Sequence, residues 1–335
     1  MNKKLIIGGP KLFDLTDNVV NELKKMGFEV TDVTYEPHFP YKYKKLSDKI
    51  YNFYRKTFFN DYQYKTKLRI EKWRDEFQHA INSVDHFEYA LFFRPDYYPI
   101  DLLQQIKSKT DQFIAYYWDG LKYFPKGKPY IGVFDRFYIF DPEDINERTL
   151  PATNFFLEDE SPKLDKEDKS IYFVGGYSNK RYKMLKKVYE VCHKTEWNID
   201  IVLVASKNTH VKKHRSDKIK VTKQSIPFSE YLSRNQKSDV ILDVSKEKHN
   251  GLSFRVFEAI GTGKKLISSN PHIRDYDFYH SSNCFVLEKN FEEPLKDFLQ
   301  KPYVPLPDHI KEKYSFGNWI KYILNIHPHQ PIKLP

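Results

Sequence analysis

The sequence predicts an α/β protein made of two doubly wound domains, and three observations support this fold class. Short apolar runs alternate with helical stretches along the 335 residues, as in proteins with parallel sheets. The alternation begins at residue 4 and begins again at residue 171, after a polar stretch at 157–169 that we expect to be a linker. A chain of this length also suffices for two cores of ordinary size.

The first half opens as strand, helix and strand, with Gly27 ending the helix. Its strands are predicted at 4–9, 28–35, 89–93, 113–118 and 136–140, and its clearest helices at 16–25 and 100–107. Gly8-Gly9 leads into Pro10 without a third glycine, so it is not a dinucleotide fingerprint. We expect this pair to let an acceptor approach the backbone.

Three predicted strands of this half end in an acid, at Asp96, Asp119 and Asp141. Because strand ends line the ligand crevice of a parallel sheet, Asp96 and Asp119 are candidate catalytic residues that would orient or deprotonate an acceptor hydroxyl. Each could equally cap the next helix or turn, and Asp141 before a proline is most simply a turn residue.

The second half restarts with a strand at 171–174, a glycine turn and a helix that runs to about Cys192. A helix that follows such a turn and carries early cations is typical of a phosphate cradle. Gly176, Ser178 and Arg181 are therefore secondary candidates for binding a phosphate.

The most informative stretch is residues 250–270, which follows a strand at 239–244. It predicts a loop, a helix that Ser253 caps, a break at Gly261-Thr262-Gly263, and another strand. Arg255 and Glu258 lie three residues apart and so share a helical face. An Arg there could bind a diphosphate and a Glu could accept hydrogen bonds from ribose hydroxyls. The alternative is an ordinary surface ion pair.

This stretch, from Gly251 through Arg255, Glu258 and Gly263 to Ser268, resembles the donor-site signature of GT-B glycosyltransferases. It is most similar to the bacterial branch with CgeB-like and lipopolysaccharide or capsule biosynthesis proteins. The resemblance implies that Glu258 binds the donor ribose and that Arg255 contacts the diphosphate. Related retaining enzymes often carry a second Glu where this chain has Asn250, so the retaining mechanism is not carried over.

The resemblance implies two Rossmann-like domains facing each other across a cleft. We expect an acceptor domain at 1–160, a nucleotide-sugar domain at 161–305, and at 306–335 a helix that crosses back to the first domain, with a tail. It also implies that the loop at Pro227 borders the nucleotide base. The predicted activity is transfer of a sugar from a nucleotide-diphosphate sugar to a hydroxyl of a cell-surface glycan or glycolipid.

Residues 41–74 carry eleven Lys or Arg, three Asp or Glu, and ten interleaved aromatic residues. One interpretation is a pair of helices whose aromatic side chains pack on the domain while the lysines are solvated. Another is a surface for an anionic membrane or a lipid-linked acceptor. A third is stacking on single-stranded nucleic acid, which we do not expect.

The net charge of +10 favours anionic partners but does not choose among them. The two cysteines, Cys192 and Cys284, are too few for a structural disulfide or a metal site and suit a reducing cytosol. His249, His272 and His280 lack carboxylates at ligand spacing, so we expect no metal and no cofactor besides the donor substrate. We expect a cytoplasmic protein, with peripheral contact to the inner membrane face as an option. The rival functions are a nucleotide-binding partner without catalysis and a nucleic-acid-binding protein.

Overall fold

The structure is a computed structural model that describes residues 3–11, 15–36, 42–61, 64–158, 169–245 and 249–335. The chain forms two compact units. The first unit holds residues 1–117, 124–138 and 147–150, and the second holds 118–123, 139–146 and 151–335. The predicted linker lies almost wholly outside the described residues, and the predicted domain boundaries stay predictions.

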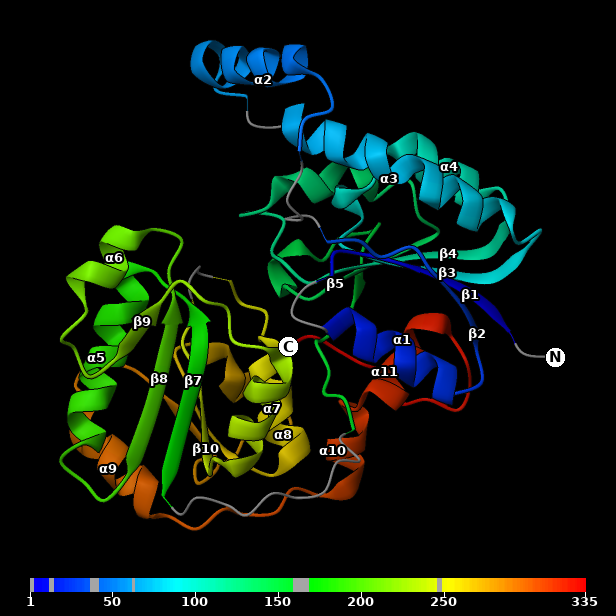
Figure 1. The fold of residues 1–335 in the computed structure, drawn as a ribbon. Helices are drawn as coiled ribbons and strands as arrows, with labels where there is room; N and C mark the ends of the chain where they lie inside the picture. Colours follow the sequence, from blue (N-terminus) through cyan, green and yellow to red (C-terminus); the bar gives the residue numbers. More distant parts are fainter. Residues whose placement is uncertain (1–2, 12–14, 37–41, 62–63, 159–168, 246–248) are drawn as a thin grey trace. The chain divides into compact units, whose positions relative to one another are not determined.

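The first unit is organised around a sheet of order β2-β1-β3-β4-β5-β6 (Figure 1). Its strands are β1 (Lys4–Gly8), β2 (Glu29–Asp32), β3 (Phe87–Phe93), β4 (Thr110–Tyr117), β5 (Arg136–Ile139) and β6 (Leu150–Pro151). β1 pairs in parallel with β2 and β3, and β3 with β4. The helices are α1 (Leu15–Lys25), α2 (Leu46–Phe59), α3 (Tyr64–Asn82) and α4 (Ile100–Lys107). In Figure 1, α3 and α4 lie on one side of the strands and α1 on the other.

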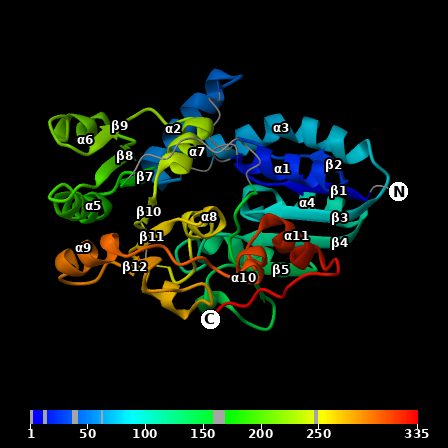
Figure 2. The ribbon, with the colours of Figure 1, turned by 90° about the horizontal axis from the view of Figure 1, so that it is seen from below.

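The second unit has a parallel sheet of order β12-β11-β10-β7-β8-β9. Its strands are β7 (Ser170–Gly176), β8 (Asn198–Val204), β9 (Lys220–Thr222), β10 (Val240–Asp243), β11 (Lys265–Ser268) and β12 (Cys284–Val286). Its helices are α5 (Asn179–Cys192), α6 (Asn208–Lys213), α7 (Phe228–Lys237), α8 (Phe254–Thr262), α9 (Glu292–Gln300), α10 (Asp308–Lys313) and α11 (Phe316–Leu324). α5 and α9 cover one face and α7 and α8 the other (Figures 1 and 2).

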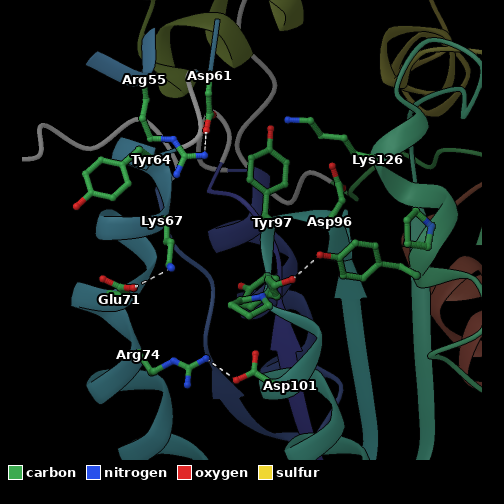
Figure 3. Close-up of a pocket in the computed structure, with 14 residues that line it drawn as sticks. Arg55, Asp61, Tyr64, Lys67, Glu71, Arg74, Asp96, Tyr97, Asp101 and Lys126 are labelled. Carbon is green, nitrogen blue, oxygen red and sulfur yellow. Dashed lines mark hydrogen bonds and ion pairs between the residues drawn. The ribbon is translucent and has the colours of Figure 1, made fainter. Parts of the chain in front are cut away.

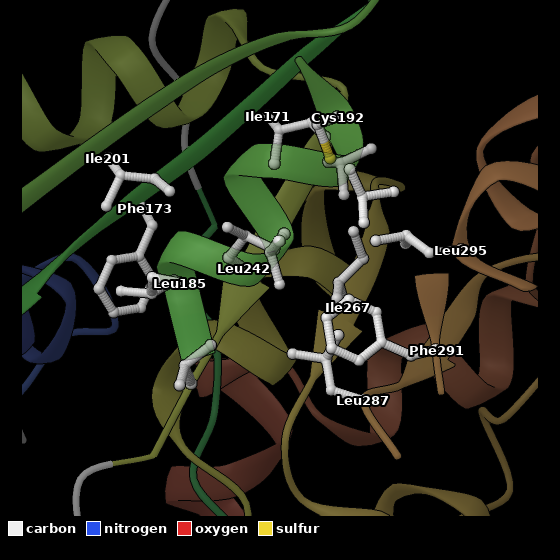
Figure 4. Packing of buried hydrophobic residues seen from close by; sticks show 14 of the residues in the cluster. Ile171, Phe173, Leu185, Cys192, Ile201, Leu242, Ile267, Leu287, Phe291 and Leu295 are labelled. Atoms are coloured by element: carbon white, nitrogen blue, oxygen red, sulfur yellow. The ribbon is translucent and has the colours of Figure 1, made fainter. Parts of the chain in front are cut away.

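The core of the second unit shows why these elements form. Apolar side chains of β7, β8, β10 and β11 meet those of α5 and α9 in one cluster (Figure 4). Phe173, Leu185, Leu242 and Ile267 in this cluster are fully buried. Strands buried on both faces need continuous apolar runs, which is the pattern that the sequence shows.

Strand order reverses beside the first strand of each sheet. In the first unit, β2 lies on one side of β1 and β3 on the other, and in the second unit β8 and β10 flank β7. The carboxyl ends of the strands beside such a reversal form the crevice where open α/β sheets bind ligands. The fold therefore offers one candidate crevice in each unit.

The predicted signature helix is confirmed as α8, with two corrections. Ser253 occupies the N-cap position, but its hydroxyl makes no capping hydrogen bond. Gly261 lies within the helix, where any larger side chain would clash with the Phe156 ring, and Gly263, in the left-handed region at φ 64°, ends the helix. Lys264, the next residue, is buried and donates from Nζ to the carbonyl oxygen of Gln236 at 2.8 Å. Short carbonyl-lined turns can hold a lysine this way when its ammonium finds acceptors.

The predicted final helix is confirmed as α11. Its Trp319 is fully buried and donates from Nε1 to the carbonyl oxygen of Thr153 at 2.8 Å, within the second unit. Its predicted crossing to the first domain stays a prediction. Cys192 and Cys284 are free and buried, which raises the pKa of each thiol to about 12. Across the described ranges, no helix has both the length and the apolar character needed to cross a membrane.

Candidate donor and acceptor sites

Two arginines form hydrogen bonds between the carboxyl ends of β7 and β10, at the point where the strand order of the second sheet reverses. Arg181, on the helix after β7, donates from Nε to the carbonyl oxygen of Val244 just beyond β10, at 2.7 Å. Arg255, on the helix after β10, donates from Nη2 to the carbonyl oxygen of Val174 in β7, also at 2.7 Å. Each helix thus holds the end of the other strand, and the crevice carries two guanidinium groups.

The two arginines differ in how exposed their guanidinium groups are and in how many hydrogen bonds these groups make. Arg181 is 8% exposed and also donates from Nη1 to the carbonyl oxygen of Gly176 at 2.7 Å. The Arg255 side chain is 25% exposed, and its buried Nε has no hydrogen-bond partner among the described residues. The exposed part of the Arg255 guanidinium is therefore open to an anion, whereas Arg181 holds the glycine turn in place.

An aromatic ring and a carboxylate position these cations. The guanidinium carbons of Arg255 and Arg181 lie 5.1 and 5.6 Å from the centre of the Phe173 ring, within cation–π range. Asp243, 1% exposed, lies 3.8 Å from Arg255 Nη1 and accepts hydrogen bonds from the hydroxyls of Ser253 (2.7 Å) and Ser268 (3.1 Å). The Ser253 hydroxyl is therefore committed to Asp243, which explains why it does not cap α8.

Glu258 lies one turn further along α8 and pairs with a tyrosine. Its Oε2 accepts a hydrogen bond from the hydroxyl of Tyr231 in α7. Burial raises the pKa of Glu258, while the Tyr231 hydrogen bond and the charge of Arg255 act in the opposite direction. Burial, and then the charge of Glu258, raise the pKa of Tyr231 well above its ordinary value. The pair places a carboxylate with one uncommitted oxygen on the same helix as Arg255.

The remaining predicted donor residues occupy helix starts in the same unit. Gly176 ends β7 and is exposed. Ser178 is the N-cap of α5, and its hydroxyl accepts from the backbone N–H of Arg181 at 3.2 Å. Pro227, exposed, occupies the N-cap position of α7, the helix that carries Tyr231. The structure thus brings Arg255, Arg181 and the Gly176 turn together, while their role in binding stays a prediction.

Asp119 belongs to the second unit and follows Trp118, whose ring makes an edge contact with Phe254 at the start of α8 (6.1 Å between centres). The next residue, Gly120, lies so near Asp141 and His249 that a side chain would touch both. Asp141 is a turn residue as expected, and its Oδ2 also accepts from the N–H of Asn250 at 3.2 Å. Asp119 therefore lies beside the signature loop, although its catalytic role is untested.

Asp96, the other candidate base, belongs to the first unit. Its side chain is 5% exposed and forms a bidentate ion pair with Arg94, with distances of 2.8 Å from Nε to Oδ1 and 2.9 Å from Nη2 to Oδ2. Arg94 has a left-handed backbone (φ 47°) at the end of β3, and its guanidinium lies over the rings of Tyr97, Tyr117 and Phe124. Both Asp96 oxygens therefore have a structural partner, and a catalytic role for Asp96 remains a prediction.

A pocket of about 1170 Å³ lies at this edge of the first unit (Figure 3). Its charged side chains form pairs: Arg55 with Asp61 (2.5 Å), Arg74 with Asp101 (2.5 Å) and Lys67 with Glu71 (4.0 Å). Tyrosines 64, 97 and 130 add aromatic surface, and the exposed Lys126 extends toward Tyr97. Balanced charges and aromatic rings suit a hydroxyl-rich ligand better than a strongly anionic one.

The crevice of the first unit is filled. The buried Tyr98 hydroxyl accepts from the N–H of Gly9 (2.7 Å) and donates to the carbonyl oxygen of Val33 (2.7 Å). A side chain at Gly8 would clash with the Phe92 ring, so this glycine serves packing between β1 and β3. The expectation that Gly8-Gly9 admits an acceptor is therefore wrong, because an aromatic side chain of the same unit takes that space.

The described residues contain no group of three or more His, Cys, Asp or Glu that could bind a metal ion. The Nδ1 atoms of His249 and His272 instead contact the Gly251 carbonyl oxygen (2.7 Å) and Asp275 (3.1 Å).

Sequence reasoning missed Asp243, Tyr231, Phe173 and Tyr98. Asp243 is the last residue of β10, so the search for acids at strand ends that selected Asp96 and Asp119 would also have found it. The other three are aromatic residues whose partners lie far along the chain, so no local pattern marks them.

No protein-family model and no curated protein matches this sequence. Similar solved structures include an alpha-glucosyltransferase in complex with UDP-glucose and DNA containing an abasic site, at 12% identity and TM-score 0.55, covering 98% of this chain and 96% of that one. Sucrose-phosphate synthase from Thermosynechococcus elongatus aligns at 11% identity and TM-score 0.56, covering 89% of each chain. A UDP-N-acetylglucosamine 2-epimerase aligns at 11% identity and TM-score 0.50, covering all of both chains. The fold is therefore the two-unit GT-B fold, as expected.

Proposed function

We propose that the protein is a glycosyltransferase that moves a sugar from a nucleotide-diphosphate sugar to a hydroxyl of a glycan acceptor. The observation that carries this proposal is the pair Arg181 and Arg255 at the reversal point of the second sheet, with the Arg255 side chain 25% exposed. The oxygens of a diphosphate would accept hydrogen bonds from the N–H groups of this guanidinium.

In this proposal Arg255 binds the diphosphate, and Glu258 accepts hydrogen bonds from the ribose through the oxygen that Tyr231 leaves available. Arg181 keeps the turn at Gly176 in the shape that lets backbone N–H groups approach the phosphates. A uridine nucleotide is the first donor to test, since one structure with this fold contains UDP-glucose.

Two fixed guanidinium groups can neutralise charge that develops on the leaving diphosphate, so we propose a reaction without a metal ion. Turnover that persists in EDTA would support this, and turnover restored only by a divalent cation would contradict it.

We propose that the acceptor is a hydroxyl-rich cell-surface glycan or glycolipid that binds the pocket of the first unit. Its aromatic rings and balanced ion pairs support this class of ligand. Asp119, beside the signature loop, is the stronger candidate for the group that orients or deprotonates the acceptor hydroxyl, because Asp96 is already paired with Arg94. A lipid-linked acceptor would place the protein peripherally on the cytoplasmic face of a membrane.

The test is thermal stabilisation by UDP, GDP, CMP, ADP and dTDP, with Glu258→Ala and the exposed helix variant Glu293→Ala as its control. Ligand at about one hundred times its dissociation constant adds roughly 2.7 kcal/mol to the native state. We expect one base to shift the wild type and Glu293→Ala equally, and Glu258→Ala much less. No shift with any nucleotide would contradict the proposal, and a shift without sugar transfer to any glycan would indicate a nucleotide-binding partner instead.

A further inference from the structure

Three polar side chains of helix α2 (Leu46–Phe59) contact neighbouring segments of the chain. Asn52 is 5% exposed and donates from Nδ2 to the Tyr43 hydroxyl at 2.7 Å. Asp48 accepts from the Tyr64 hydroxyl of α3 at 3.0 Å. Arg55 pairs with Asp61 at 2.5 Å. The inner face of this helix is therefore held by hydrogen bonds and an ion pair.

The outer face of α2 is apolar. Leu46, Ile50 and Phe53, at positions i, i+4 and i+7, form one stripe and are 72%, 60% and 68% exposed. Phe58 and Phe59 at the end of the helix are 68% and 64% exposed. An amphipathic helix of a water-soluble domain normally turns such a stripe inward. The interpretation in which the aromatic residues of 41–74 pack on the domain therefore does not hold for Phe53, Phe58 and Phe59.

Positive charge borders this stripe. Lys49 and Lys56 lie three or four residues from Phe53 and therefore line one flank of it. Lys42, Lys44 and Lys45, all exposed, precede the helix. Residues 42–59 contain six Lys or Arg and one Asp. The surface formed by Lys42–Lys45 and the Leu46–Ile50–Phe53 stripe, called the α2 surface below, is thus both apolar and cationic.

We propose that the α2 surface docks on an anionic lipid bilayer, with the stripe in the interfacial layer and the lysines at the headgroups. A bilayer of this kind matches both the apolar stripe and its cationic border. A second copy of the chain would bring the same positive charge to the contact. Nucleic acid would match the lysines but leave the aliphatic Leu46 and Ile50 without a stacking partner.

The α2 surface is close to the pocket of the first unit, so docking on a membrane would also position that pocket. Arg55 and Asp61, at the end of α2, line the pocket of the first unit (Figure 3). A membrane-bound α2 would hold that pocket beside headgroups, where the sugar of a glycolipid lies. This benefit rests on the proposed function, whereas the binding itself does not.

The test is co-sedimentation of the full chain with vesicles of phosphatidylcholine alone or with one third phosphatidylglycerol. We expect binding to the anionic vesicles, weakened at least about tenfold by the double variant Ile50→Ser/Phe53→Ser. The control, Ile145→Ser/Val304→Ser, removes two other exposed apolar side chains and should bind as the wild type does. Unchanged thermal stability and nucleotide response of both variants would show that they fold and that the donor site is intact.

Three results would overturn the proposal. The first is equal sedimentation of the wild type with both vesicles or with neither. The second is no vesicle binding together with stripe-dependent binding of a single-stranded oligonucleotide, which would favour nucleic acid. The third is dimerisation without lipid that the stripe variant abolishes and vesicles do not compete with.

Discussion

The strand orders of both sheets reverse beside their first strand, yet different side chains occupy the two reversal points. In the first unit, the neutral Tyr98 hydroxyl satisfies Gly9 and Val33 and fills the space. In the second unit, Arg181 and Arg255 donate to the carbonyl oxygens of Val244 and Val174, and the Arg255 side chain is 25% exposed. The same topology thus yields one crevice closed by its own residues and one lined by two guanidinium groups.

The charges around these two crevices extend the comparison. Three cations of the first-unit pocket, Arg55, Arg74 and Lys67, have carboxylate partners at Asp61, Asp101 and Glu71. In the second crevice, Arg255 lies 3.8 Å from the carboxylate of Asp243, whereas Arg181 donates to the carbonyl oxygens of Val244 and Gly176. Fold alone therefore does not decide which unit binds the nucleotide; the side chains at the reversal point do.

The largest effect is expected for Arg255→Ala. Loss of a charge-assisted contact to the diphosphate should weaken nucleotide binding about 100-fold, or roughly 2.8 kcal/mol. Isothermal titration with the stabilising nucleotide measures this, with the exposed Arg274→Ala, which loses a surface pair to Glu288, as its control. If both variants bind within threefold of the wild type, the second crevice is not the anion site.

Arg181→Ala should lower the free energy of unfolding by about 2–3 kcal/mol, because the carbonyl oxygens of Val244 and Gly176 lose a buried charged donor. Urea denaturation of both arginine variants checks this, and Arg255→Ala should lose less. A variant as stable as the wild type that fails only to bind nucleotide would show that Arg181 is a ligand residue and not a brace.

Tyr98→Phe tests the closed crevice. Removing the hydroxyl leaves the Gly9 N–H and the Val33 carbonyl without this partner, which should cost about 1–2 kcal/mol of stability. Nucleotide affinity should not change. Tyr123→Phe, at an exposed site, should cost nothing measurable. Weaker nucleotide binding in Tyr98→Phe would show that the two crevices are not independent.

The smallest effect is expected for Glu258→Gln without ligand. Burial raises the pKa of Glu258, so ionisation of its carboxyl begins to destabilise the native state as the pH rises above 4.5, and the loss is complete once the pH exceeds the raised value. Glutamine avoids this cost and still accepts the Tyr231 hydrogen bond. The variant should be the more stable protein at pH 7, with the difference shrinking as the pH falls toward 4.5, the ordinary value for Glu. A difference that grows on acidification would contradict the assigned burial.

Much of the fold was predictable because its signals are local. The predicted helix at 100–107 coincides with α4, and the strand–turn–helix from 171 to Cys192 is confirmed as β7 and α5. β9 was missed because a three-residue edge strand with a lysine has no apolar run to mark it. The helical register of Arg255 and Glu258 was also readable from spacing alone.

The partners of the candidate residues were not predictable, because they depend on contacts between distant segments. Spacing suggested that Arg255 and Glu258 could pair with each other, yet Arg255 binds Val174 and Glu258 binds Tyr231. Likewise, composition marked 41–74 as basic and aromatic but could not show that Asn52 faces inward and Phe53 outward. Such orientation is decided by tertiary packing.

The most direct test of the central claim is hydrogen–deuterium exchange of the intact chain with and without saturating UDP. Bound nucleotide should slow exchange in peptides covering 174–182, at the end of β7, and 251–259, at the start of α8, and leave peptides covering 5–11 and 94–99 unchanged. Protection confined to the first unit, or none in the second, would contradict the assignment of the nucleotide site to the crossed arginines.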